Sequence, residues 1–288
     1  MKLAELHAHV FMDGIDYKKS VEKFRQSVCT EHVRNVLKAY QDEGIDFIRD
    51  GGDHFEACLY AKSIAKEYGI TYITPAFAIF KEGNYGSVIG RSYKTMQEYA
   101  RLVADARDKG ADFIKIMVSG ILDFNQFGIV SKTDYLLDDV KELVHIAHEE
   151  GFSVMAHASG SNEVHIAALA GVDSIEHGYY VDDEALDIMR DKNIVWVPTA
   201  VTCENLKGSG RFNEEAVCQI SANHQEAILK AKEKHVHIGL GSDAGAYNVL
   251  HAKGCKDEYN LLKKILGTQT DQIIETSTQI IKDKFSVL

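Results

Sequence analysis

Residues 106–120 read ARDKGADFIKIMVSG, and this stretch shows the alternation that decides the fold. An amphipathic, helix-like run ends at Gly110, and an apolar run typical of a buried β-strand begins directly after it. Glycine commonly ends a helix because it readily adopts the left-handed conformation that leads into a short loop. The stretch therefore predicts a helix that is followed at once by a strand.

The same punctuation recurs along the chain. Gly44, Gly69, Gly151 and Gly171 each end an amphipathic run that precedes an apolar one, and Asn193 does so once. Together with the first and the last apolar runs, they give eight strand candidates. These are residues 3–10, 45–52, 70–77, 111–120, 152–160, 172–180, 194–199 and 237–245.

Helical patterns follow the strand candidates. One of them begins with Thr95 and Glu98, which form a capping box. Eight strand–helix units in 288 residues, without a strand-only region, fit a closed parallel barrel better than an open sheet. We therefore predict an α/β fold of the (β/α)8 TIM-barrel class, formed as a single domain by residues 1–288. Residues 81–93 and 120–135 are expected to be irregular loops beyond strand ends.

The composition narrows the classes of partner. The chain carries 43 acidic and 32 basic residues, a net charge of −11, which argues against nucleic acid or an anionic membrane as a partner. The five cysteines form no C-x-x-C pair, which is typical of reduced thiols in a cytoplasmic protein. Neither a signal peptide nor a membrane span is predicted. We expect a cytoplasmic protein with a small-molecule substrate, and a homo-oligomer is left open.

Polar side chains lie late in five of the predicted strands. Groups at the C-terminal ends of barrel strands meet at one face, where barrel enzymes carry their sites. In the first strand, His7 and His9 are two residues apart, so both rings point to the same face. The full set is His7, His9, Lys115, His157, His177 and Asp243. We expect these side chains to converge on one mouth.

The residue types in this set favour a metal site. Imidazoles and a carboxylate are good ligands for Zn²⁺ or a similar ion, and their number exceeds what one tetrahedral ion uses. Two divalent ions are therefore expected. A cationic Lys115 would be repelled by them, but burial lowers the pKa of a lysine, and a neutral amine can take up CO₂. We hypothesise that carboxylated Lys115 bridges the two ions.

The motifs ELHAHV, FIRDGG, GADFIKIMVSG, AHASG, GVDSIEHG and GLGSDAG occur in this order. With their spacing, they resemble the amidohydrolase superfamily across nearly the whole chain. The resemblance is greatest to its imidazolonepropionase-like and metal-dependent dipeptidase (prolidase-like) branch. It implies that His7, His9 and Asp243 bind one ion, that His157 and His177 bind the other, and that carboxylated Lys115 bridges them with a hydroxide.

Such a centre implies hydrolysis of a C–N bond. The bridging hydroxide attacks the carbonyl, while Asp243 is the expected catalytic acid and base that carries its proton to the departing amine. Small amides such as dipeptides or cyclic amides are the expected substrates. Members of this branch usually carry a small β-sandwich, but only six residues precede His7, so this module is not expected here.

Four further residues are candidates for substrate contact. Tyr179 and Ser159 follow ligand-bearing strands, His251 matches a family position in a loop over the site, and Arg49 belongs to the motif FIRDGG. Aromatic packing at the rim, loop packing and a buried ion pair are the structural alternatives for Tyr179, His251 and Arg49, respectively. Glu176 is expected to point away from the barrel interior, because neighbours on a strand face opposite sides.

Three other functions remain open. A phosphotriesterase-like or lactonase hydrolase could use the same binuclear site. An aldolase-type barrel could use Lys115 to form a Schiff base, which burial also favours. A metal-binding remnant without turnover is the non-enzymatic alternative, although the presence of Asp243 argues against it.

Overall fold

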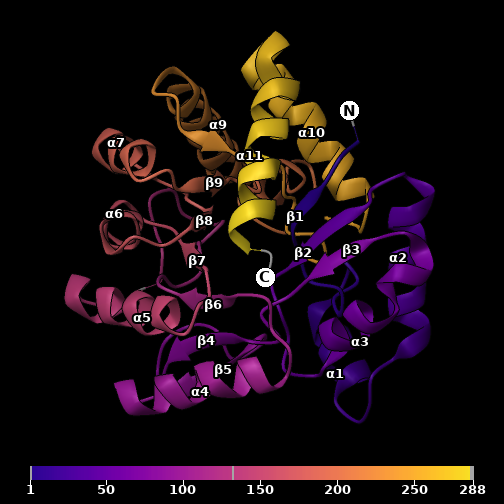
Figure 1. Ribbon diagram of the computed structural model, residues 1–288. Helices are drawn as coiled ribbons and strands as arrows, with labels where there is room; N and C mark the ends of the chain where they lie inside the picture. The colour runs from indigo at the N-terminus through magenta and orange to yellow at the C-terminus, as the bar shows by residue number, and fades with distance from the viewer. Residues whose placement is uncertain (1, 132, 286–288) are drawn as a thin grey trace.

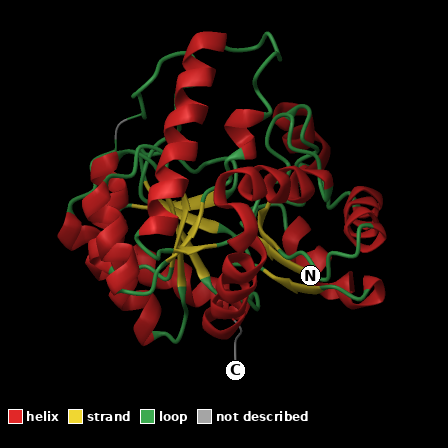
Figure 2. Cartoon of the chain, turned by 90° about the horizontal axis from the view of Figure 1, so that it is seen from above, coloured by secondary structure: helices red, strands yellow, loops and turns green. Residues whose placement is uncertain are grey.

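The computed structural model describes residues 2–131 and 133–285. Seen from above, the strands lie in the middle of the molecule and the helices surround them (Figure 2). The strands are β1 (Glu5–Ala8), β2 (Phe47–Asp50), β3 (Thr71–Ile73), β4 (Ala78–Lys81), β5 (Gly90–Tyr93), β6 (Ile114–Met117), β7 (Val154–Ala158), β8 (Ser174–His177), β9 (Val195–Val197) and β10 (His237–Ile238).

Helices follow the strands as the alternation predicts (Figure 1). They are α1 (Tyr17–Phe24), α2 (Thr30–Asp42), α3 (Ala57–Ile64), α4 (Met96–Asp108), α5 (Leu137–Glu149), α6 (Ser161–Ala170), α7 (Asp183–Asp191), α8 (Val201–Glu204), α9 (Glu214–Glu233), α10 (Lys253–Leu266) and α11 (Thr270–Phe285). The 3-10 turns are η1 (Ala65–Tyr68) and η2 (Gly267–Gln269). The capping box of Thr95 and Glu98 begins α4, as predicted. No helix in the described ranges is long and apolar enough to cross a membrane.

Parallel pairing joins the strands into a closed barrel. The hydrogen-bonded orders are β1-β2-β3 and β10-β9-β8-β7-β6-β4-β5. At one seam the backbone N–H of Asp243 donates to the carbonyl of His7 at 2.7 Å. At the other, the N–H of Asp112 donates to the carbonyl of Thr74 at 2.9 Å. The predicted (β/α)8 barrel is confirmed, with β3 and β4 together filling the third strand position.

Residues 81–93 differ from the prediction of an irregular loop. They contain β5, which pairs with β4 in parallel at the edge of the sheet. A Cβ atom on Gly90 would lie 2.4 Å from the carbonyl oxygen of Ala78, so this strand depends on glycine for a close approach. Its sequence GRSY has no apolar run, which is why periodicity did not reveal it. Residues 120–131, by contrast, form a loop with a single antiparallel bridge, as expected.

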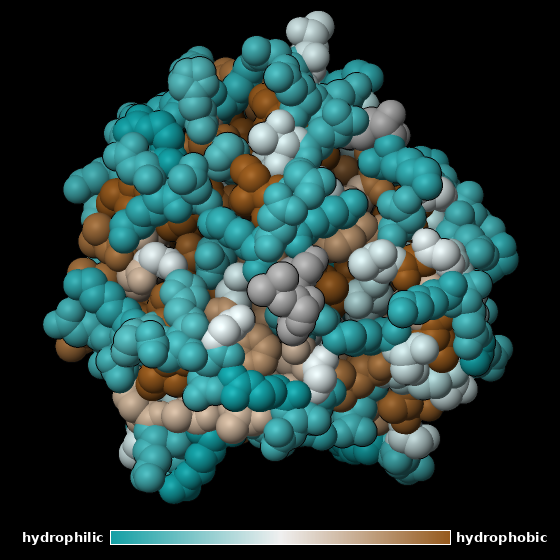
Figure 3. Space-filling model, viewed as in Figure 1, coloured by the Kyte–Doolittle hydropathy of each residue, from teal (hydrophilic) through white to brown (hydrophobic). Residues whose placement is uncertain are grey.

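An apolar layer fills one end of the barrel, the floor. Its buried side chains are Ala4, Leu6, Phe47, Ile73, Phe113, Met155, Val195 and Val197, together with Ile281 and Phe285 of α11. Figure 1 shows α11, in yellow, crossing this end of the barrel. The Phe285 ring lies 5.2 Å from that of Phe113 and 4.7 Å from the guanidinium carbon of Arg49. From this side the surface is mostly hydrophilic (Figure 3). The floor is therefore closed, and the site lies at the opposite end.

Candidate metal centre

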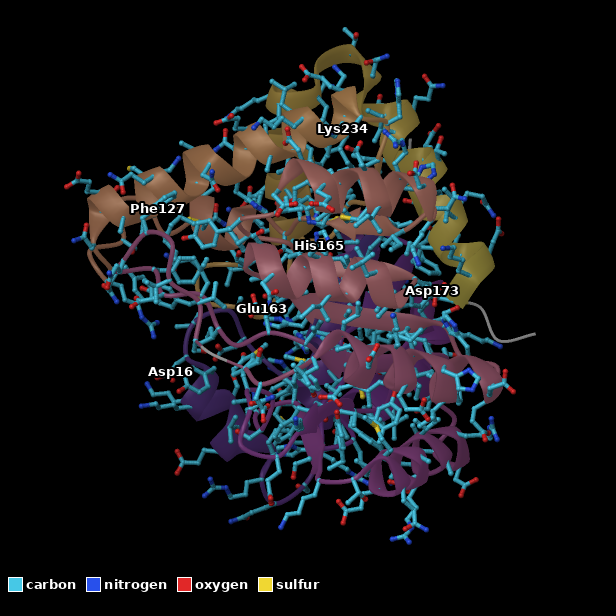
Figure 4. All side chains as sticks on the ribbon, turned by 90° about the vertical axis from the view of Figure 1, so that its left-hand side faces the viewer. Asp16, Phe127, Glu163, His165, Asp173 and Lys234 are labelled. Carbon is cyan, nitrogen blue, oxygen red and sulfur yellow. The ribbon has the colours of Figure 1, made fainter. Side chains whose placement is uncertain are left out.

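The six predicted ligand residues meet at the end of the barrel opposite α11. Figure 4 labels two residues at that end, Asp16 from the loop after β1 and Phe127 from the loop after β6. Strands β1, β6, β7 and β8 bring His7, Lys115, His157 and His177 to this end. The remaining two, His9 and Asp243, follow β1 and β10.

His7, His9 and Asp243 form the first half of the centre. Their ligand atoms all lie within 4.8 Å of one another. Asp243 Oδ1 is 3.5 Å from His7 Nε2 and 3.7 Å from His9 Nε2. Both Nε2 atoms are 3.3 Å from Lys115 Nζ. These atoms thus surround one small space, as ligands of a single ion must.

Outer partners orient the two imidazoles of this half. His9 Nδ1 lies 3.0 Å from the carbonyl oxygen of Gly52, which can only accept, so Nδ1 carries the proton and Nε2 keeps its lone pair. His7 Nδ1 lies 2.7 Å from Glu176 Oε2 and is assigned in the same way. A metal-ligating histidine is usually held like this by a carboxylate or a carbonyl.

His157 and His177 form the second half, with ring centroids 4.6 Å apart. His177 Nδ1 is 2.8 Å from the hydroxyl of Thr199, which leaves Nε2 free. His157 uses the other nitrogen: its Nε2 lies 3.0 Å from the carbonyl oxygen of Gly120, so Nδ1 is the free ligand atom. The rings of His177 and His7 are 5.0 Å apart, so the two halves adjoin.

Irregular backbone turns extra side chains into the barrel. The backbone of His177 has a φ of 68°, outside the extended region, so this residue joins Glu176 on the interior side. The expectation that Glu176 points away is therefore wrong. Asp243 also has a left-handed φ, 57°. In β1, a register shift lets both Leu6 and His7 face the interior.

Arg49 lies between the metal centre and the floor. Its guanidinium donates to Glu176 Oε1, to the hydroxyl of Ser174 and to the carbonyl of Leu6, each at 2.8 Å. Arg49 and Glu176 are both fully buried. This is the buried ion pair of the structural alternative, and it places Arg49 out of reach of a substrate. Its role is to hold Glu176, which in turn orients His7.

Burial sets the protonation of the ligands. It lowers the pKa of Lys115 to about 8, so a neutral amine is accessible near neutral pH. It lowers the pKa of His157 to about 4 and that of His177 well below the usual range, so both are unprotonated. It raises the pKa of the Asp243 carboxyl to about 7, which suits a group that exchanges a proton at neutral pH.

The donor set fits a pair of transition-metal ions. Free imidazole nitrogens and a carboxylate are the ligand types of Zn²⁺. A Cβ atom on Gly51 would lie 2.4 Å from the His9 ring and 2.6 Å from Lys115 Nζ, so glycine keeps space open beside both side chains. A second cluster of acidic residues contains Asp50 and Asp53. It is less suited to binding a metal ion, because backbone N–H groups already donate to both carboxylate oxygens of each residue.

A cavity of about 340 Å³ opens above the centre. Tyr179 and Ser159, both predicted to contact substrate, line it. His251 does not line it, because its Nε2 lies 2.8 Å from the carbonyl oxygen of Met12 within the loop packing. The structure therefore places His251 in the loop packing, away from the cavity, and not at the predicted substrate contact.

Tyr85 lines the cavity and was missed by the sequence reasoning. Its ring centroid is 5.5 Å from that of His157. The loop is held there by Gly86, where a Cβ atom would lie 2.6 Å from the Phe80 ring. The glycines of this loop indicate that its backbone packs closely against other residues, but they do not indicate which side chain of the loop lies in the cavity.

Comparison with known proteins agrees with this geometry. The model of the Amidohydrolase family matches residues 2–276. The chain belongs to the amidohydrolase family. This confirms the resemblance drawn from the motifs and places the chain in a family of hydrolytic enzymes.

Ochratoxinase of Aspergillus niger is similar in sequence, with 26% identity over 245 residues that cover 75% of this chain and 49% of the relative. The chain thus spans about half the length of the curated relative it matches. The crystal structure of A. niger ochratoxinase has a TM-score of 0.77 at 20% identity and covers 99% of this chain and 71% of that one. A Xaa-Pro dipeptidase with bound methionine has a TM-score of 0.76 at 21% identity, covering 99% and 76%. These structural likenesses show the shared barrel fold.

Proposed function

We propose that this protein is a metal-dependent hydrolase of C–N (amide) bonds in a small substrate such as a dipeptide or a cyclic amide. The observation that carries the proposal is the convergence of His7, His9, Lys115, His157, His177 and Asp243 below one cavity, with a free nitrogen on each imidazole. The names of an Xaa-Pro dipeptidase and an ochratoxinase among its relatives support an amide substrate.

We assign the ligands as follows. His7, His9 and Asp243 would hold one divalent ion, with Zn²⁺ as the expected metal, His157 and His177 would hold a second, and carboxylated Lys115 would serve as the shared ligand. When bound, such ions supply an acidified water as nucleophile and polarise the scissile carbonyl. Carboxylation of Lys115 needs its neutral amine, and the lowered pKa of this side chain supports that form.

The residues of the chain move the proton and exclude water. Asp243 is the catalytic residue: its carboxylate takes a proton from the attacking water and returns it to the amine nitrogen that leaves. Burial raises the pKa of this carboxyl to about 7 in the metal-free protein, which favours a role in proton transfer near neutral pH. Tyr85, Tyr179 and Ser159 form the nearby cavity lining, which holds the substrate and limits access of bulk water.

Metal content and substrate panels test the proposal. We expect elemental analysis to find two divalent ions per chain, and intact mass under non-acidic conditions to show one added CO₂. Dipeptides and cyclic amides should be hydrolysed faster than lactones and phosphotriesters. Faster turnover of a lactone or phosphotriester would instead favour those activities of the same site.

A Schiff-base reaction at Lys115 is the second chemistry to be separated. Its neutral amine supports it, but Nζ lies 3.3 Å from two imidazole nitrogens. Borohydride trapping of a carbonyl substrate on the metal-free protein, with turnover undiminished, would overturn the hydrolase assignment. If the protein binds metal ions but hydrolyses none of these compounds, the result would favour the alternative of a metal-binding protein that has lost its catalytic activity.

A cytoplasmic location is part of the proposal. All five cysteines are free thiols in the structure, as expected for a reducing compartment. Fractionation of cells that express the tagged chain tests it.

A further inference from the structure

One side of the cavity is an apolar wall. It consists of Leu122, Phe124, Leu206, Phe212 and Tyr247. These side chains come from the loops that follow β6, β9 and β10, and they belong to one hydrophobic cluster. The rings of Phe124 and Phe212 lie 5.5 Å apart and connect two of the loops.

Cationic groups are scarce along the cavity. Within residues 2–131 and 133–285, Lys115 is the only lysine or arginine that lines it, and its Nζ lies at the base among the imidazoles. Arg211 is the cation beside the apolar wall, with its guanidinium carbon 4.1 Å from the Tyr247 ring centroid. It is exposed and does not line the cavity. An anionic group packed against the wall inside the cavity would therefore meet no cationic side chain among the described lining residues, apart from Lys115 at the base.

The Tyr179 hydroxyl does not replace a cation. Thr202 Oγ1 donates to the carbonyl of Thr199 at 2.8 Å, and this uses the only proton of the threonine hydroxyl. Tyr179 must then donate its own proton to Thr202 Oγ1, also at 2.8 Å. Towards the cavity, Tyr179 offers a lone pair, which a carboxylate does not bind.

These features select by charge. A carboxylate that leaves water without a cationic partner loses hydration that neutral hydroxyls replace only in part, whereas an aromatic or hydrocarbon group gains contact with the wall. The net charge of −11 opposes the entry of anions as well. A carboxylate next to the scissile bond is a separate case, because it would lie close to the metal ions.

We propose, on the basis of the hydrolase function above, that the substrate is an amide with an uncharged aromatic or hydrocarbon group against the apolar wall. The enzyme discriminates against amides that carry a carboxylate at that position. This narrows the substrate class from small amides in general to lipophilic amides such as N-acyl arylamides.

Three acetanilides of similar size test the proposal on the metal-loaded protein. They are 4-methylacetanilide, 4-acetamidobenzoate and 4-acetamidobenzamide, whose differing groups are remote from the scissile bond. We expect kcat/KM for the methyl compound to exceed that for the benzoate by at least about 100-fold. The neutral benzamide controls for electron withdrawal and should fall closer to the methyl compound. A benzoate within threefold of the methyl compound would overturn the inference.

A pair of variants places the charge inside or outside the cavity. Ile121 lines the cavity and is 51% exposed, so Ile121→Arg adds a cation to the cavity lining without disturbing the core. Leu229 lies on α9, is 41% exposed and does not line the cavity, so Leu229→Arg is the matched control. Ile121→Arg should raise kcat/KM for the benzoate at least tenfold, and Leu229→Arg should leave the preference within about twofold. Equal effects of both variants would contradict the proposal.

Binding separates failure of this inference from failure of the proposed function. If no acetanilide is hydrolysed, the amidase assignment fails for these compounds. Calorimetric binding to the metal-loaded protein then tests whether the apolar wall prefers an uncharged group. The methyl compound should bind at least tenfold more tightly than the benzoate. Equal affinity, the reverse order, or no binding of any of the three would overturn the inference.

Discussion

The two halves of the metal centre differ in what holds their imidazoles. Nδ1 of His7 is held by the carboxylate of Glu176, which is itself fixed by Arg49. Nδ1 of His177 is held only by the hydroxyl of Thr199. The first half also contains a carboxylate, Asp243, whereas the second has two imidazoles and, in our proposal, would take its anionic ligand from carboxylated Lys115. The first half is therefore organised before an ion arrives.

This difference predicts unequal affinities for the two ions. The first half should bind its ion more tightly, because a charged outer partner, Glu176, orients and polarises His7. Removing Lys115, the proposed shared ligand, should reveal the difference in affinity between the two ions. Removing Glu176 or Thr199 should change the affinity of one half alone. The predictions below run from the largest expected effect on the centre to the smallest.

Lys115→Ala removes the group between the halves. We expect kcat/KM to fall by at least about 10³-fold, and the metal content to fall from two ions to one held by His7, His9 and Asp243. Elemental analysis and kinetics measure both quantities. Propionate, whose carboxylate can take the place proposed for the lysine carbamate, should restore part of the activity. A variant that keeps two ions and full activity would show that the halves are independent of Lys115.

Glu176→Gln removes the charged support of the first half. The variant leaves Arg49 buried without an anion, which should lower the free energy of unfolding by about 3–5 kcal/mol. It should also lower the affinity for the first ion by about 10–100-fold. Metal titration calorimetry and denaturant unfolding give the two values. Combining it with Arg49→Met should restore stability without restoring metal affinity, and recovery of both would contradict a role in orienting His7.

Thr199→Val removes the hydroxyl that supports the second half. We expect the affinity for the second ion to fall by at most about tenfold and the affinity for the first ion to stay unchanged. The loss is small because a neutral hydroxyl polarises His177 less than a carboxylate polarises His7. Two-site calorimetry resolves the two ions. Thr199→Ser keeps the hydroxyl and serves as the control. An equal loss at both sites would remove the distinction between the halves.

Glu258 supports the backbone beside Thr199 and gives a pH-dependent effect without changing a ligand. Its carboxyl accepts from the N–H groups of Ala200 and Val201, and burial raises its pKa to about 8. The folded state thus keeps a proton that the unfolded chain has lost, so the stability due to this group falls as pH rises from its unfolded pKa towards 8. The Tm of the metal-free protein minus that of Glu258→Gln should therefore be larger at pH 5.5 than at pH 8. A difference that grows with pH would contradict this assignment.

The sequence was most informative where function and periodicity coincide. Each predicted ligand lies late in an apolar run, and the ends of parallel strands meet at one face, so convergence of His7, Lys115 and His157 followed from order alone. Strict alternation failed where the backbone leaves the extended region. The left-handed φ of His177 brought in Glu176, and the register shift in β1 separated Glu5 from the face that carries His7.

Loop contacts were beyond the reach of sequence reasoning for a different reason. Tyr85 and the apolar wall acquire their positions from packing between loops that are remote in sequence, such as that of Phe124 on Phe212. No periodicity specifies such contacts. The same applies to Arg49, because its motif allowed either a substrate contact or an ion pair, and only the position of Glu176 distinguishes them.

The closed floor of the barrel has a consequence for synthesis of the protein. Phe285 packs beneath Phe113 and Arg49, although it follows Arg49 by more than two hundred positions in the chain. During translation, the charged interior therefore stays open to water from below until this phenylalanine has emerged from the ribosome. Premature termination before α11 should yield an unfinished barrel that chaperones retain and proteases degrade, even though every proposed metal ligand has already been made.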